Sequence, residues 1–475
     1  MNIRNATLGS QRVDIIIEDG RIASVLPAVG GDHPADIDAQ GRWVIPGLWD
    51  EHVHLGVWAQ HATRCDVLAA ENADEAVALM RAHVAGDDGP IVGTGLRYAL
   101  WDVQPTMAKL DEVSAERAVV VFSMDVHSCW VNSVAARRYG VVEQAGESGI
   151  LREHDSFALL TALAQIPDDA MDALIDRVAQ SAAARGVVGV TSFEMEDPAH
   201  WIRRVANGFD TLRINASVYP DRLSQAIEAG WKTGDTIAGD VTMGFLKVIS
   251  DGAINTRTAC CHDPYPDGSG YGVMNIENAD LIDLMSRARD AGIGSAIHAI
   301  GDAANTHVID AFEAVGVAGR IEHAQMVRRS DVTRMARLGL VASVQPKHAV
   351  DDRDVADELW RGRDWAYPMA SLRAAGVRVI CGSDAPVAPL DPWLSIQCAV
   401  TRTAGDRPAW HPDEALTIDE ALDCSTRSTV AVGQPADLVL LDRDPYACPG
   451  TELASMPVSL TMLAGRVTFD AKATA

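Results

Sequence analysis

The chain has 475 residues, of which 48% are hydrophobic and 22% charged, as is usual for a globular protein with room for more than one domain. Its formal net charge of −26 disfavours nucleic acid and anionic lipid as partners, because both need a basic protein face. No stretch approaches the roughly 18 apolar residues of a membrane span, the N-terminus lacks an apolar secretory segment, and the eight cysteines include no C-x-x-C pair, so we expect a cytoplasmic protein with reduced thiols.

Both ends of the chain consist of short apolar runs separated by turns. Near the N-terminus, Asp19-Gly20 lies between two such runs, which is a strong signal for a β-hairpin. Near the C-terminus, Gly465 occupies the centre of a similar turn. This pattern predicts that residues 1–47 and 430–475 pair into one small β-sandwich domain.

Between these ends, residues 48–429 alternate strand-like runs with segments of helical periodicity, such as ADLIDLMSRARDAG, ANTHVIDAFEAVG and SDVTRMARLG. The runs are, in order, WVIPGLW, VVGVTSF, RINASVY, FLKVIS, IGSAIHA, RIEHAQ, LVASVQP and VRVICGSD. Strand–helix alternation predicts a parallel α/β sheet, and eight strands predict a TIM (β/α)8 barrel, with a doubly wound open sheet as the alternative. A stretch at roughly residues 60–185 is too long for one crossover, and we expect it to be an insertion over the barrel mouth.

Side chains that can bind metals stand at the ends of several runs. His52 and His54 follow the first run, and two residues i and i+2 on an extended chain point to the same face. His298 ends the fifth run, His323 the sixth and Asp384 the eighth. Because functional groups of such barrels lie at the carboxyl ends of the strands, these positions predict a metal site.

The chemistry of this set favours zinc. Four imidazoles and a carboxylate suit a borderline ion such as Zn²⁺. Lys247 lies in the apolar fourth run, where an unpaired ammonium is costly, so it has either a carboxylate partner or no charge. If CO₂ carboxylates it, the carbamate could bridge two ions about 3.5–4 Å apart, so one or two divalent ions remain open. Glu322, next to His323, is expected to face the opposite side of its strand.

These motifs resemble the amidohydrolase superfamily, and within it the YtcJ-like branch (the Amidohydro_3 group, which includes N-substituted formamide deformylase). The resemblance implies a barrel in which His52, His54 and Asp384 hold the more buried ion and His298 and His323 hold the second. Lys247 would bridge the ions if carboxylated. The stretches that carry the resemblance are VIPGLWDEHVHL, DVHSCWVNSVA, FLKVISDGAINTRTA, HAIGDAAN, RIEHAQ, SVQPKH, GSDAPVAPLDPW and GQPADLVLLD. One departure is a shortened segment between DCSTRST and GQPADL.

The expected reaction is hydrolysis of a non-peptide amide or related C–N bond in a small-molecule substrate by metal-activated water. Asp384 could accept the proton of that water and pass it to the leaving nitrogen. His348, after the seventh run, is a second catalytic candidate that could donate to an oxyanion or a substrate carboxylate. Two alternatives are a deaminase of a nucleobase-like heterocycle with one ion and a non-catalytic relative.

Four further residues are candidates for substrate binding or for positioning. Glu194 ends the second run, and Asp302 follows His298 and could either fix it or cap a helix. Arg257 could clamp an anionic group or form a structural ion pair, and His127, in the insertion, could line the mouth. A homodimer would be in keeping with such a relative.

Overall fold

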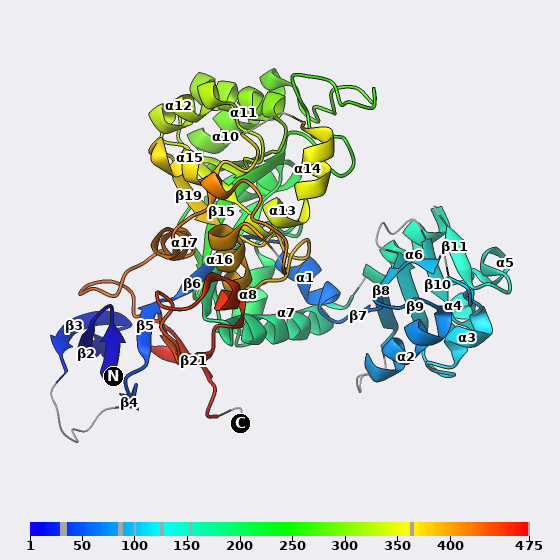
Figure 1. Ribbon diagram of the computed structural model, residues 1–475, viewed down its shortest axis with the longest axis horizontal. Coiled ribbons are helices and arrows are strands. Elements are labelled where there is room, and N and C mark those ends of the chain that lie inside the picture. Colours follow the sequence, from blue (N-terminus) through cyan, green and yellow to red (C-terminus); the bar gives the residue numbers. More distant parts are fainter. Residues whose placement is uncertain are drawn as a thin grey trace. The chain divides into compact units, whose positions relative to one another are not determined.

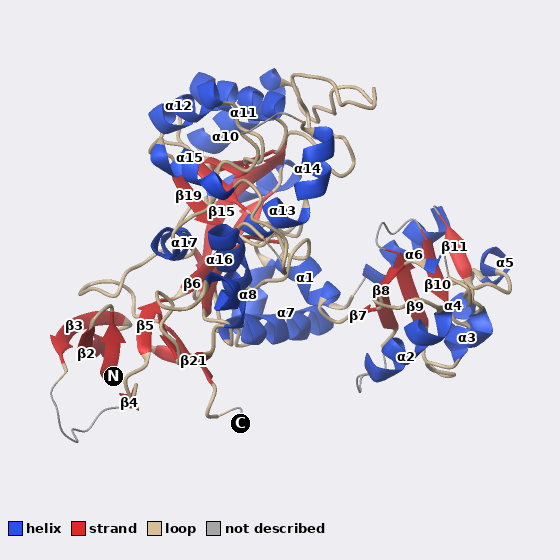
Figure 2. Cartoon of the chain, viewed as in Figure 1, coloured by secondary structure: helices blue, strands red, loops and turns tan. Residues whose placement is uncertain are grey.

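The computed structural model describes residues 1–28, 36–83, 89–98, 101–123, 128–152, 154–164, 166–361, 365–403 and 405–473. The chain divides into two compact units, one made of Met1–Trp58 with Ile175–Ala475 and the other of Ala59–Leu174. Figure 1 labels the helices and strands, and Figure 2 distinguishes them by colour. Among the described residues, none of the helices combines the length and the apolarity needed to cross a membrane.

All eight predicted runs contribute a strand to one parallel barrel (Figure 2). Neighbours in the chain are neighbours in the sheet, and Val53 at the end of the first strand bridges Ala385 just beyond the last. The predicted TIM barrel is therefore confirmed, and the doubly wound alternative is wrong. The strands are β6 (Leu48–Val53), β12 (Val187–Ser192), β13 (Arg213–Val218), β15 (Val241–Ile249), β16 (Ser295–Ala299), β17 (Arg320–His323), β18 (Val341–Val344) and β19 (Arg378–Cys381), with β14 (Thr236–Ala238) antiparallel on β15.

The first predicted run is split between two sheets. Trp43–Pro46 form β5 in the sheet of the termini, and β6 in the barrel begins at Leu48. Gly47 makes the junction, and a Cβ there would lie 2.4 Å from both methyl groups of Val188, so only glycine fits. One residue therefore joins the two sheets.

Strands from both ends of the chain form one eight-stranded sheet (Figure 1). Asp19 and Gly20 both have positive φ, +48° and +73°, as does the pair Ala464 and Gly465, at +48° and +78°, so both predicted turns have the backbone that two-residue hairpins need. Apolar side chains of both ends share one core. The strands are β1 (Asn2–Leu8), β2 (Gln11–Glu18), β3 (Arg21–Pro27), β4 (Ile37–Asp38), β5, β20 (Leu438–Leu441), β21 (Val458–Leu463) and β22 (Arg466–Asp470).

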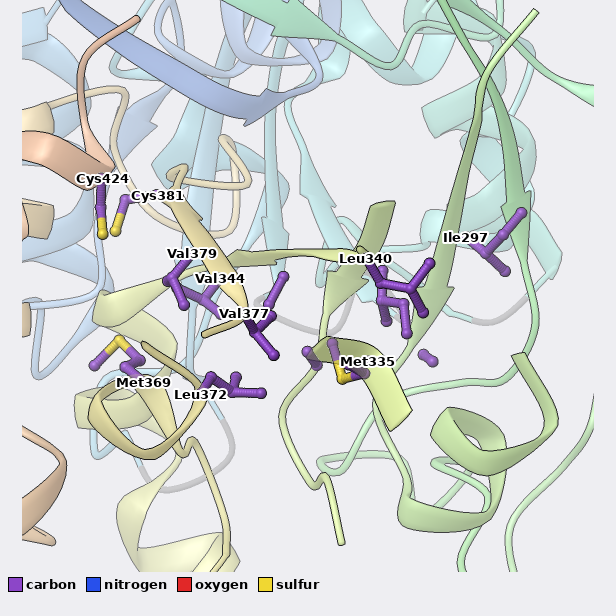
Figure 3. Packing of buried hydrophobic residues seen from close by; sticks show 14 of the residues in the cluster. Ile297, Met335, Leu340, Val344, Met369, Leu372, Val377, Val379, Cys381 and Cys424 are labelled. Atoms are coloured by element: carbon purple, nitrogen blue, oxygen red, sulfur yellow. The ribbon is translucent and has the colours of Figure 1, made fainter. Parts of the chain in front are cut away.

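Helices pack their apolar faces on the barrel. Figure 3 shows Val344 of β18 and Val379 of β19 facing Met369 and Leu372 of α15. The three predicted helical segments are α10, α11 and α12, and Gly316 ends α11 in the left-handed conformation that glycine favours. The helices of this unit are α8 (His200–Ala206), α9 (Leu223–Glu228), α10 (Asn278–Asp290), α11 (Asp302–Val315), α12 (Arg329–Leu338), α13 (Pro346–Asp351), α14 (Arg353–Leu359), α15 (Met369–Ala374), α16 (Pro392–Thr401) and α17 (Ile418–Cys424), with short 3-10 turns η2 (Pro220–Arg222), η3 (Pro412–Glu414) and η4 (Gly450–Ser455).

The unit Ala59–Leu174 has its own five-stranded sheet, in the order β11-β10-β9-β8-β7, and its own apolar cores. Its strands are β7 (Cys65–Asp66), β8 (Ile91–Leu96), β9 (Val119–Ser123), β10 (Ser128–Val131) and β11 (Ile150–Arg152), and its helices are α2 (Ala73–His83), α3 (Met107–Asp111), α4 (Ser133–Arg138), α5 (Val142–Ala145) and α6 (His154–Ala164). Helices α1 (Leu55–His61) and α7 (Asp168–Ala183) lead into and out of it. Its location over the barrel mouth stays a prediction, and His127 lies outside the described residues.

Candidate metal centre

Four histidines from three barrel strands gather at the carboxyl ends of those strands. The ring centroid of His52 lies 5.6 Å from that of His54 and 4.9 Å from that of His323, and the centroids of His298 and His323 are 4.4 Å apart. Asp384, three residues beyond the end of β19, joins them: its Oδ1 is 3.3 Å from Nε2 of His52 and 3.4 Å from Nε2 of His54. The structure thus brings these five sequence candidates together.

The tautomers of His52 and His54 can be read from their other ring nitrogens. His54 Nδ1 lies 2.8 Å from the Phe193 carbonyl oxygen, which only accepts, so this nitrogen carries the proton. His52 Nδ1 lies 2.7 Å from the Glu322 carboxylate and donates in the same way. Each Nε2 therefore turns a lone pair toward Asp384 Oδ1, and the three donor atoms lie within 4.8 Å of one another. Two imidazole nitrogens and a carboxylate oxygen in this arrangement could hold a divalent cation.

The ionisation of these groups agrees with a cation position. Burial, together with the charge of Lys247, lowers the pKa of His52 to about 4, so its imidazole is neutral near pH 7. Burial opposes ionisation of Asp384, but His52 and His54 outweigh it and hold the pKa of this carboxyl well below its usual range. Burial opposes protonation of His54, but the hydrogen bond and the charge of Asp384 outweigh it and raise the pKa of His54.

Glu322 corrects the expectation that it faces away from the site. It is fully buried and accepts from His52 Nδ1, so it shares the barrel interior with the candidate ligands. The alternation of side chains ends at its neighbour His323, whose φ of +77° turns the ring to the same region. Burial opposes ionisation of Glu322, but Arg320 and His52 reverse its effect and hold the pKa of Glu322 well below its usual range.

His323 and His298 also have fixed ring orientations. His323 Nδ1 lies 2.8 Å from Gln345 Oε1, and the other end of that amide donates to the Ser343 carbonyl, so His323 presents Nε2 as an acceptor. His298 Nε2 lies 3.3 Å from Asp251 Oδ1. The sequence patterns did not identify Asp251 or Gln345 as site residues. Asp251 nevertheless follows a predicted strand directly, as the candidate ligands do.

Lys247 is buried inside the barrel, with Nζ 4.9 Å from the centroid of the Phe193 ring. Burial lowers the pKa of Lys247 to about 8, although Glu322 and Asp384 act in the opposite direction. A pKa this close to neutrality leaves part of the amine unprotonated, and the unprotonated amine is the form that reacts with CO₂.

Four ionised residues form a network next to these groups, and we call Glu51, Arg320, Glu322 and Arg427 the inner network. The first three are buried in the barrel, and Arg427 is partly exposed. Arg320 donates to Glu322 Oε1 at 2.8 Å and to Glu51 Oε2 at 3.1 Å. Arg427 holds both Glu51 oxygens at 2.6 Å. Burial opposes ionisation of Glu51, but the two arginines outweigh it and lower the pKa of Glu51 to about 2. Here every carboxylate faces a donor.

The remaining candidates lie in different surroundings. His348 places Nε2 3.8 Å from Asp384 Oδ2, and its donor atom lies within 4.8 Å of those of His323 and Asp384, as in a second potential cation group. Glu194 accepts the N–H of Gly56 at 2.7 Å, and burial raises the pKa of Glu194 to about 7.

Arg257 and Asp302 have partners outside the histidine cluster. Arg257 is exposed and pairs with Asp267 at 2.9 Å, as in the structural alternative. Asp302, at the start of α11, accepts the backbone N–H of His262 at 3.0 Å. The carboxylate that faces His298 is Asp251.

Comparisons with known proteins identify relatives that match nearly the whole chain. A family model described as "Amidohydrolase family" matches residues 36–469. The putative amidohydrolase YtcJ of Bacillus subtilis is 25% identical, over 97% of this chain and 97% of its own. N-substituted formamide deformylase of Arthrobacter pascens is 26% identical, over 96% and 94%. An uncharacterized metal-dependent hydrolase from Pyrococcus horikoshii has a TM-score of 0.80 at 24% identity, covering 94% of this chain and 98% of that chain.

Proposed function

The chain belongs to the amidohydrolase family, as its motifs suggested, and on that premise we propose that it hydrolyses a non-peptide amide of a small molecule with one or two zinc ions. Membership makes it a metal-dependent hydrolase of carbon–nitrogen bonds. The observation that carries the proposal is the meeting of Nε2 of His52 and Nε2 of His54 at Asp384 Oδ1, because a divalent cation would bind all three atoms. Imidazole nitrogens with a carboxylate oxygen are a donor set that zinc prefers.

In the proposed reaction, the bound ion and Asp384 have different roles. A bound divalent ion would polarise the substrate carbonyl and lower the pKa of its coordinated water to about 7. Asp384 is held by its backbone N–H, which donates to the His52 carbonyl at 2.7 Å. With Oδ1 directed at His52 and His54, Asp384 Oδ2 is the atom free to accept a proton and return it to the leaving nitrogen.

Whether the site binds a second ion depends on the chemical state of Lys247. We propose that it is carboxylated and bridges two ions; its burial and lowered pKa support this, because both favour the reactive amine. Elemental analysis of protein purified without chelator, with and without bicarbonate, is the test. A zinc content near two ions per wild-type chain, falling to one in Lys247→Ala, supports the bridge. A content of one ion in both proteins contradicts the bridge and favours the alternative function, a deaminase of a nucleobase-like heterocycle.

Hydrolysis itself is tested by screening N-acyl and formamide compounds with the zinc-loaded protein. Asp384→Asn should lower kcat by about 10²–10⁴, because the amide cannot accept and return the proton. Arg257→Gln, outside the cluster, is the control and should keep full activity. An Asp384→Asn variant that binds zinc and retains full activity would remove Asp384 from the mechanism.

The cytoplasmic location and the homodimer remain proposals of the sequence. Cell fractionation tests the first, and sedimentation of the purified protein tests the second. All eight cysteines are free thiols, in keeping with the first proposal.

A further inference from the structure

Two cysteine thiols meet between the last barrel strand and a helix that packs on it. Figure 3 shows the sulfur of Cys381, at the end of β19, beside the sulfur of Cys424, at the end of α17. Both side chains belong to the core between the barrel and its helices and are 3% and 1% exposed. A hydrogen bond joins the two thiols. The fold therefore brings together two sulfurs that α16 separates in the chain.

A guanidinium group contacts this pair. Arg373 of α15 directs Nη1 at Cys424 Sγ, which lies 3.2 Å away. The same nitrogen lies 3.0 Å from Asp423 Oδ2, and Nε lies 3.7 Å from Glu420 Oε1. Both carboxylates are exposed, so water screens their charges, whereas the contact with the sulfur is on the buried side. A positive charge in contact with a thiol favours its thiolate, which is the nucleophilic form.

The surroundings make the two thiols unequal. The hydrogen bond from Cys381 and the charge of Arg373 outweigh burial and lower the pKa of Cys424. The same hydrogen bond, together with burial, raises the pKa of Cys381 well above its ordinary range, so this thiol keeps its proton and donates it to Cys424. At Cys129 and Cys398 burial dominates and raises the pKa to about 12. Cys424 is therefore the nucleophile of the pair.

We propose that Cys381 and Cys424 form a redox-active dithiol, which hydrogen peroxide oxidises to an intramolecular disulfide with Cys424 as the attacking thiol. The oxidant has to be small, because both thiols are buried. The side chain in contact with Cys424 that reaches solvent is the partly exposed Arg373. This modification site does not depend on the proposed hydrolysis or on a bound metal.

The oxidation proceeds in two steps. The Cys424 thiolate attacks one oxygen of hydrogen peroxide: an S–O bond forms, the O–O bond breaks, and the departing hydroxide takes up the proton that Cys424 released. The Cys381 sulfur then attacks the Cys424 sulfur: an S–S bond forms, the S–O bond breaks, and the second hydroxide leaves as water with the Cys381 proton. The two thiols together lose two electrons, and one peroxide is reduced to two waters.

The disulfide would link two segments that hold the barrel together. Strand β19 ends at Cys381, and just beyond it Ala385 bridges Val53 and so closes the barrel. Helix α17 ends at Cys424 and leads to Arg427, which binds both oxygens of Glu51 in the inner network. Oxidation would therefore join the strand that closes the barrel to the helix that leads into the inner network.

The test is oxidation of the full chain in its native state. The protein is treated with hydrogen peroxide, unfolded in an alkylating reagent, and cleaved before aspartate, since Asp384 and Asp391 separate Cys381 from Cys398. We expect mass spectrometry to find the fragments of Cys381 and Cys424 joined, with a mass two hydrogens below their sum. A pair that stays reduced, that forms two sulfinic acids, or that bonds to other cysteines overturns the proposal.

Two variants test the roles within the pair. In Cys381→Ala no thiol attacks the sulfenic acid of Cys424, so dimedone, which traps sulfenic acids, should label Cys424. Arg373→Gln should slow disulfide formation by about tenfold, because fewer Cys424 side chains are ionised. Arg443→Gln is the matched control: Arg443 Nη1 lies 3.6 Å from Cys448 Sγ, and its loss should leave the rate unchanged. Label on a cysteine other than Cys424, or a wild-type rate in Arg373→Gln, overturns Cys424 as the attacking thiol.

Discussion

The inner network and the candidate metal centre lie in the same barrel and have opposite electrostatic designs. In the inner network, Glu51 and Glu322 face Arg320, and Arg427 binds both oxygens of Glu51. In the metal centre, two imidazole lone pairs face a carboxylate oxygen. Glu322 belongs to the first and fixes His52 of the second. A network of paired charges can therefore fix the orientation of a neighbouring side chain while the polar atoms of that side chain stay available to a ligand.

Breaking the inner network should have the largest effect on stability. Arg320→Met leaves Glu51 and Glu322 without their shared buried cation, and we expect a loss of about 3–5 kcal/mol in the free energy of unfolding. Urea unfolding measures it. The matched control is Arg337→Met, which breaks an exposed pair with Glu313 and should cost at most about 1 kcal/mol. Equal losses in the two variants would contradict the contrast.

Acid should weaken the same network in a defined pH window. The pKa of Glu51 falls from its ordinary 4.5 to about 2 on folding, so its ionisation stabilises the fold fully above pH 4.5, and this stabilisation is lost as the pH falls through 2. The size is roughly 3 kcal/mol. Between pH 5 and 2.5, the unfolding free energy of the wild type should therefore fall more steeply than that of Glu51→Gln. Parallel curves would show that Glu51 does not titrate in this window.

Removing the metal should change stability through the candidate metal centre and not through the inner network. A zinc concentration of 100 times Kd should add about 2.7 kcal/mol to the unfolding free energy, and chelator should remove it. His54→Ala should lose this gain and match the wild type in chelator, because His54 belongs to the cluster and not to the inner network. Thermal unfolding with and without zinc gives both values. A variant that keeps the full zinc gain would exclude His54 as a ligand.

Most of the fold could be predicted because strands and helices are encoded locally. The eight barrel runs have apolar periodicity within a few residues, and their order follows from the alternation with helices. The division of the first run at Gly47 could not be predicted, because the apolar pattern continues across it. The residue that requires glycine there is Val188, which is distant in the chain.

The candidate site was predictable where a strand end identifies the residue, as for His298 and Asp384. The site could not be predicted where the backbone departs from regular strand geometry. Strand alternation predicted that Glu322 and His323 face opposite sides, but the positive φ of His323 interrupts this alternation. Hydrogen-bond partners that are far apart in the chain could not be predicted either. Tyr367 meets Gln325 across 42 residues, and nothing local to either residue indicates the other.

The junction at Gly47 has a consequence for biosynthesis. Strand β5, which leads into the barrel, pairs with β20, where Trp43 lies opposite Leu441. At a translation rate of 5–20 residues per second, β5 waits roughly 20–80 s for that partner to be made. During this time an apolar strand edge is open to other chains, so nascent protein should depend on chaperones or on slow expression to avoid aggregation.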